Sequence, residues 1–320
     1  MRSQRRRRSN LRIFLLVLLV AIFSFAFWLY ASLHELTTGQ RLLPWRAYGE
    51  CEPPPPEQLP STVRVGFYEE FPNPWRLAKL KQLDFPITLA VAAPNRQEFE
   101  RLRDEISAEY PMVREVIYWP TLSLAEGYYL GGLSDPQAIR RIIDESHDLP
   151  LLWDLELPRQ FPVNILRLLE RSLHNRPQIG AFLRQHQQPV HIWRTHTLMG
   201  LDPFFLRLLG LQFAPDDGPQ VRLHLDLYTM GTGAGAKADD VRRITRCGIR
   251  RYGERFIPSL GVLNDQEGPE EHFVSVEVFR RNLQIVREEG AAEVWIFGSN
   301  GLNQEYLQAL HDILPLEKAE

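Results

Sequence analysis

Residues 87–110 read ITLAVAAPNRQEFERLRDEISAEY and contain two kinds of segment in succession. The run ITLAVAAP (87–94) is short, apolar and typical of a buried strand. The residues after it place Phe99, Leu102, Ile106 and Tyr110 at helical spacing, which predicts an amphipathic helix over 96–110. A strand followed by a helix is the unit from which parallel α/β folds are built.

The same alternation repeats along the chain from Val63 onward. The β-rich runs occupy 63–71, 87–94, 113–120, 151–158, 190–197, 221–230, 256–263 and 293–301. Their starts lie 24 to 39 residues apart, which is enough for a strand, a helix and two loops. Eight such units predict a (β/α)8 TIM barrel, with a doubly wound open sheet as the second possibility. The glycine stretch at 231–236 lacks the spacing of a dinucleotide-binding loop; we interpret it as a mobile loop and expect no cofactor.

Active sites of TIM barrels lie at the C-terminal ends of the strands, so polar residues that point inward there are the candidates. Residues i and i+2 share a face of a strand. We expect the leucines at 223, 225 and 227 to face the surrounding helices, so the residues between them should point into the lumen. Applied to the first, fourth and sixth runs, this test turns inward Arg64, Gly66, Tyr68, Glu70, Asp154, Glu156, Arg222, His224, Asp226 and Tyr228. Three strands would then aim carboxylates into one mouth. The alternative is a structural ion-pair network, for example Arg64 and Arg222 with Glu70 and Asp226.

Aromatic residues accumulate at the same strand ends, namely Tyr68, Trp119, Trp193, Tyr228 and Trp295. A single aromatic residue is usually core filler. Several rings beside carboxylates suit a carbohydrate, whose C–H faces stack on rings and whose hydroxyls hydrogen-bond to acids. Asp154 and Asn300 are further candidates for hydrogen bonds to such a ligand.

Eight β/α units, Glu156 at the end of the fourth run and Trp295 on the eighth resemble the TIM-barrel glycoside hydrolases over residues 63 to about 314. Leu155 stands where many of these families have Asn, and the end of the seventh run offers Asp265 rather than a Glu. The resemblance implies a glycosidic bond cleaved between two carboxylates, one protonated as acid and one ionised as base or nucleophile. It makes Glu156 the candidate acid, and Asp226 or Glu70 the candidate base or nucleophile.

Two other interpretations fit the same residues. Sugar-isomerase-like barrels hold divalent metals at strand ends, and this chain offers Glu70, Glu156, His196 and Asp226, although no two of them form a metal-binding pair on one strand. The third interpretation is a barrel that binds a glycan or a protein without cleaving it, because fold does not imply function.

The N-terminal segment predicts a membrane anchor. Residues 13–33, IFLLVLLVAIFSFAFWLYASL, contain no charge and no proline, and as a helix they would span about 31 Å, close to the bilayer's hydrocarbon thickness. Six arginines lie in residues 1–12, and the positive-inside rule keeps that tail in the cytoplasm. We expect an uncleaved anchor in the lipid bilayer; a cleaved signal peptide and a twin-arginine export signal are the alternatives. Residues 34–62, with prolines at 53–56, are interpreted as a stalk that carries the barrel domain, 63–320, outside the cytoplasm.

Composition narrows the function classes further. Apart from the six N-terminal arginines, the chain carries 31 basic and 40 acidic residues, which argues against a nucleic-acid partner. Two cysteines, Cys51 and Cys247, are too few for a disulfide scaffold or a cysteine-rich metal site. Cys51 lies in the expected stalk, where it is a candidate for a disulfide within the chain or between chains.

Overall fold

The computed structural model describes residues 51–52, 59–158, 165–194, 203–227, 237–262 and 274–317. The strands are β1 (Arg64–Glu69), β2 (Ile87–Ala93), β3 (Val113–Pro120), β4 (Leu151–Leu155), β5 (Val190–Arg194), β6 (Val221–Asp226), β7 (Phe256–Gly261) and β8 (Glu293–Phe297). They are parallel and pair in chain order, and β8 pairs with β1 to close a barrel. The predicted eight-stranded barrel is confirmed, and the open sheet is excluded.

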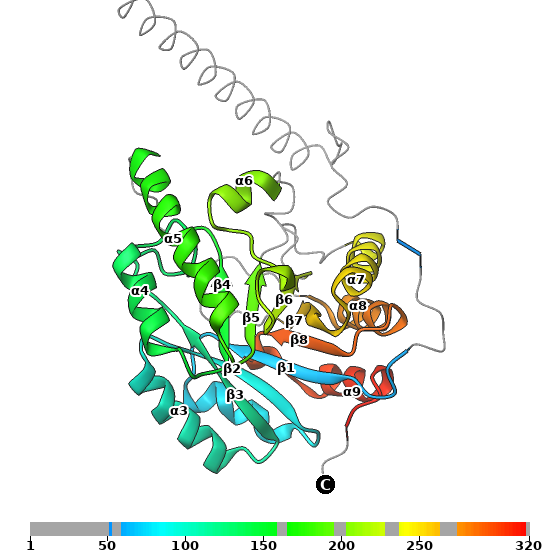
Figure 1. Ribbon diagram of the computed structural model, residues 1–320. Helices are drawn as coiled ribbons and strands as arrows, with labels where there is room; N and C mark the ends of the chain where they lie inside the picture. The colour runs from blue at the N-terminus through cyan, green and yellow to red at the C-terminus, as the bar shows by residue number, and fades with distance from the viewer. Residues whose placement is uncertain are drawn as a thin grey trace, which may run out of the picture. The chain divides into compact units, whose positions relative to one another are not determined.

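Helices surround the barrel (Figure 1). They are α2 (Pro74–Leu77), α3 (Arg96–Glu109), α4 (Pro136–Glu145), α5 (Ile165–Gln185), α6 (Pro203–Leu208), α7 (Ala238–Tyr252), α8 (Val276–Glu288) and α9 (Gln304–Ile313), with short 3-10 turns η2 (Ala78–Gln82), η4 (Pro215–Asp217), η5 (Gly253–Arg255) and η6 (Ser299–Gly301). α3 begins where the side chain of Asn95 accepts the backbone N–H of Glu98, an N-cap that satisfies an otherwise unpaired donor. The helix buries Phe99, Leu102 and Ile106, as their spacing predicts.

The seventh strand forms despite its irregular sequence. Pro258 lacks a backbone N–H for the ladder, yet β7 pairs with both β6 and β8, and Pro258 stands opposite Leu225. The barrel therefore tolerates one missing donor in a strand that neighbours hold on both sides.

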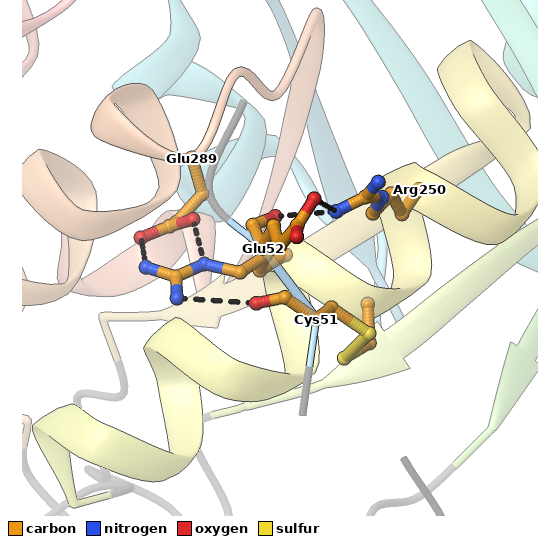
Figure 2. The surroundings of a disulfide bond; sticks show 6 residues. Cys51, Glu52, Arg250 and Glu289 are labelled. Carbon is orange, nitrogen blue, oxygen red and sulfur yellow. Dashed lines mark hydrogen bonds and ion pairs between the residues drawn. A yellow bond between two sulfur atoms is a disulfide. The ribbon is translucent and has the colours of Figure 1, made fainter. Parts of the chain in front are cut away.

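A disulfide joins the expected stalk to the barrel. Cys51 is bonded to Cys247 of α7, at a sequence separation of 196. Figure 2 shows that arginines of α7 hold the same short segment: Arg246 donates to the carbonyl of Cys51 at 3.3 Å, and Arg250 donates to the carbonyl and carboxylate of Glu52 at 3.2 Å. The buried carboxylate of Glu289, directly after α8, positions Arg246 through two hydrogen bonds of 2.7 and 2.8 Å. The disulfide is thus within the chain, one of the two arrangements expected for Cys51.

The described part of the chain contains no helix that is both long and apolar enough to cross a membrane. The expected anchor, 13–33, and most of the expected stalk lie outside the described residues.

Candidate active site

The lumen is closed at its N-terminal end by an ion-pair cluster around Glu293, the first residue of β8. Its carboxylate accepts hydrogen bonds from Arg64 and Arg222, each at 3.1 Å, and from the indole Nε1 of Trp295 at 2.5 Å. Arg64 is the register partner of Glu293 across the closure of the barrel. The structural network that we considered for these arginines therefore exists, but its acid is Glu293 rather than Glu70 or Asp226, which lie at the other ends of their strands.

Above this cluster, a chain of hydrogen bonds crosses the barrel. The hydroxyl of Tyr68 bonds to Oγ of Ser259 at 2.7 Å and to Nδ1 of His224 at 2.5 Å, and Nε2 of His224 meets Nδ1 of His191 at 2.6 Å. Burial lowers the pKa of both histidines, of His191 to about 3, so both rings are neutral. A neutral ring has one donor and one acceptor nitrogen. His224 therefore accepts a hydrogen bond from one of its two neighbours, Tyr68 and His191, and donates one to the other.

Trp295 fills the centre of the lumen. Its ring is fully buried, with centroids 4.9 Å from Tyr68, 4.8 Å from His224 and 5.3 Å from His191. Gly66 makes room for it, since a Cβ at that position would come within 2.2 Å of the indole. The expectation that Trp295 lies at the mouth as a sugar platform is wrong, because the ring belongs to the barrel's filling and its N–H is taken by Glu293.

Two of the predicted carboxylates are buried near the C-terminal ends of their strands. Asp154 and Asp226 are both buried, and the charge of each raises the pKa of Tyr68, on top of the larger effect of burial. Glu156 is half-buried and directly follows β4, two residues beyond Asp154. The acids thus come from β4 and β6, as the alternation of side chains predicts.

Two of the predicted aromatic residues line this region. Trp119 packs edge-on against Tyr68 with ring centroids 6.2 Å apart. Trp193 is the register partner of Asp154 on one side and of His224 on the other. Its indole Nε1 is buried and has no hydrogen-bond acceptor among the residues that the structure describes, which leaves a donor for a ligand.

Glu70 lies apart from this group, at the rim of the barrel. Its Oε1 accepts a hydrogen bond of 2.7 Å from the hydroxyl of Tyr128, in the loop after β3, and both line a hollow outside the lumen chain. Its neighbour Glu69 is fully enclosed: it accepts hydrogen bonds from the Ser299 hydroxyl and from the backbone N–H of Phe71, and pairs with Arg76 at 3.6 Å. Burial raises the pKa of Glu69 more than these partners lower it.

Several predicted residues fall outside the described part of the chain: Tyr228, His196, Asp265 and the side chain of Asn300. Within the described residues, no group of three or more His, Cys, Asp or Glu side chains is arranged to hold a metal ion.

Sequence reasoning missed Ser259, Glu293, Glu69 and Tyr128. The alternation test would have found Ser259 and Glu293 if it had been applied to the last two runs, since both share a face with residues now in the lumen. Glu69 falls on the face that alternation turns outward, and Tyr128 lies in a loop, so no periodicity marks either.

Comparison with known proteins finds no matching family model and no matching curated protein. Among solved structures, a GH18 chitinase from Pseudoalteromonas aurantia is 10% identical over 79% of this chain and 100% of its own, with a TM-score of 0.46. A chitinase from Chromobacterium violaceum is 9% identical over 78% of this chain and 98% of its own, with a TM-score of 0.47. A GH5 family lichenase from Caldicellulosiruptor sp. F32 is 9% identical over 83% of this chain and 97% of its own, with a TM-score of 0.43. The likeness is one of barrel architecture, which the strand pairing of this chain shows by itself.

Proposed function

We propose that the protein is a glycoside hydrolase that cleaves a glycan by acid–base chemistry at the mouth of the barrel. The observation that carries the proposal is that Asp154 and Asp226 are both buried near the C-terminal ends of their strands, β4 and β6. Buried carboxylates are costly, and a barrel without a site would fill such positions with aliphatic side chains.

Each acid has a role in the proposal. Glu156, half-buried at the end of β4, protonates the departing sugar oxygen. Asp226, from β6, acts as the base or nucleophile. Asp154 and the free indole N–H of Trp193 bind hydroxyls of the sugar, while Trp119 and Tyr68 form the wall of the site. Glu70, at the rim with Tyr128, serves in binding rather than in the chemical step.

The pairing of the arginines favours the enzyme over a barrel that only binds. Arg64 and Arg222 would have neutralised the acids of a purely structural lumen, but both pair with Glu293 at the N-terminal end. The carboxylates of the mouth thus belong to a separate cluster.

We further propose that residues 13–33 anchor the protein in a membrane and that the barrel lies outside the cytoplasm. The apolar stretch after six arginines supports the anchor. The disulfide between Cys51 and Cys247 supports an oxidising compartment, because such bonds seldom persist in the cytosol. With Cys51 held on α7, only residues 34–50 can act as the spacer between anchor and barrel.

Two experiments test these proposals. Purified full-length protein in detergent should release new reducing ends from a polysaccharide in a panel of glycans, and replacing Asp226 by Asn should abolish the release. Protease added to intact spheroplasts should digest the barrel. Full protection of the barrel, or a mature N-terminus near His34, would refute the proposed topology.

A further inference from the structure

A hollow of about 430 Å³ lies at the rim, over the C-terminal ends of β1, β2 and β3. Its polar lining includes Glu70, Asn73, Glu98 and Tyr128, and its apolar lining includes Phe71. The volume falls in the range of small-molecule sites, which combine apolar walls with a few polar groups. The acids of the proposed catalytic site come from β4 and β6, across the mouth.

The loop after β1 holds its side of the hollow rigidly. Glu69 accepts the backbone N–H of Phe71, and Asn73 caps α2 by accepting the N–H of Arg76. The guanidinium of Arg76 lies 5.4 Å from the ring of Phe71 and 5.2 Å from that of Trp75. Both rings are nevertheless exposed, Phe71 by 46% and Trp75 by 44%. Phe71 lines the hollow, so its open ring is available to stack on a ligand there.

The loop after β3 presents Tyr128 from the other side. Its φ of +68° lies in the left-handed region, a conformation that strains a residue with a side chain. Glu126 holds the loop in this shape by accepting from the N–H and hydroxyl of Ser123 and pairing with Arg141 at 2.8 Å. In this conformation the hydroxyl of Tyr128 donates a hydrogen bond to Glu70, so the strained residue contributes directly to the lining of the hollow.

The charges of the hollow select the kind of ligand. The carboxylate oxygens of Glu70 and Glu98 are hydrogen-bond acceptors, so the ligand must bring its own donors. Glu98 is paired with Arg101, and Glu70 accepts the hydroxyl of Tyr128, but a carboxylate has lone pairs for more than one donor. An anionic ligand would be repelled, whereas a neutral ring with many hydroxyls can donate to Glu70 and lay its C–H face on Phe71.

We infer that this hollow is a second sugar-binding site, which takes a neutral ring of the same glycan chain that is cleaved at the mouth. The inference rests on the proposed glycoside hydrolase function, because it assumes that one glycan occupies both sites. It implies that the substrate is an oligosaccharide or polysaccharide, since one ring is bound at the rim while another is cleaved at the acids of β4 and β6.

Binding to the Glu156→Gln full-length protein tests the second site without cleavage of the ligand. The ligands are cello- and xylo-oligosaccharide series of rising length, with glucosamine oligomers as a cationic series and polygalacturonate as an anionic one. Affinity for at least one neutral series should rise steeply once the chain is long enough to cross the mouth. Phe71→Ala and Tyr128→Phe, made in the same background, should each remove about tenfold of that gain. Leu173→Ala, an exposed change on α5, is the matched control and should leave affinity unchanged.

Three results would overturn the inference: affinity that does not depend on chain length, a length dependence that survives both rim substitutions, or binding by none of the neutral series. Stronger binding of the glucosamine oligomers than of both neutral series would show that the site prefers a cation and would also contradict it. Failure of the proposed catalysis would give a different result. The parent protein, with Glu156 intact, would then bind long chains at the rim but release no reducing ends from them.

Discussion

The hydroxyl of Tyr68 hydrogen-bonds to Nδ1 of His224 at 2.5 Å in the interior of the barrel, and the other nitrogen of that ring meets His191. The two imidazoles are buried beneath the proposed catalytic acids. The charge of Arg222 disfavours the protonation of both rings, on top of the larger effect of burial, and Arg64 adds to this at His191. The carboxylates of the mouth therefore rest on a neutral, hydrogen-bonded floor.

The neutral histidines predict a loss of stability in acid. His191 has a pKa of about 3 in the folded protein, against about 6.5 in an unfolded chain. Below about pH 6.5 the unfolded state binds more protons, so the free energy of unfolding falls as pH is lowered, by up to about 1.4 kcal/mol per pH unit for each ring. Denaturant unfolding across this range should show the decline.

A variant isolates the contribution of one ring. Glu69, whose pKa is raised by burial, acts in the opposite sense, so the slope must be compared between proteins. His191→Gln should lower the slope of the free energy of unfolding against pH by the equivalent of about one proton. His174→Gln, at an exposed position on α5, should not alter that slope. Equal slopes for wild type and His191→Gln would contradict the neutral assignment.

Gly66→Ala should destabilise the barrel. The added Cβ would lie 2.2 Å from Cε2 of the Trp295 indole, which Tyr68 and the two histidines prevent from moving. Overpacking of this kind costs about 1–3 kcal/mol. Gly180→Ala, in the interior of α5, is the control: its nearest neighbour is the flexible end of Arg184 at 3.4 Å, so a gain of about 0.5–1 kcal/mol is expected. Equal stability changes in thermal unfolding would show that Trp295 is not held as described.

Reduction of the disulfide should lower stability by about 2–4 kcal/mol, because it frees a long loop of the unfolded chain. The measurement is unfolding with and without a thiol reductant. A double variant with Cys51→Ser and Cys247→Ser should be insensitive to reductant. Maleimide labelling of protein taken directly from cells should require prior reduction; labelling without it would argue against the oxidising compartment.

The fold was predictable from sequence because eight strand-like runs alternate with helical segments at nearly regular spacing. Alternation within a run also placed Tyr68, His224 and Asp226 in the lumen correctly. These features are local, since each depends only on the residues of one strand and on which face is apolar.

The remaining features depend on contacts between distant segments. Glu293 neutralises Arg64 because β8 closes against β1 in a register that no single run specifies. The depth of Trp295 depends on the missing side chain of Gly66 in the neighbouring strand. The partner of Cys51 and the reach of Tyr128 toward Glu70 likewise come from tertiary packing.

The most direct test of the central proposal compares Glu156→Gln with the parent protein on a glycan that the parent cleaves. The substitution keeps the shape of the side chain and removes the proton that the departing oxygen needs, so turnover should fall at least about 10²-fold while glycan affinity and unfolding temperature stay close to those of the parent. Glu254→Gln, at an exposed position in η5, is the matched control and should keep full turnover. Turnover of Glu156→Gln equal to that of the parent would contradict the assignment of Glu156 as the acid and, with it, the proposed mechanism.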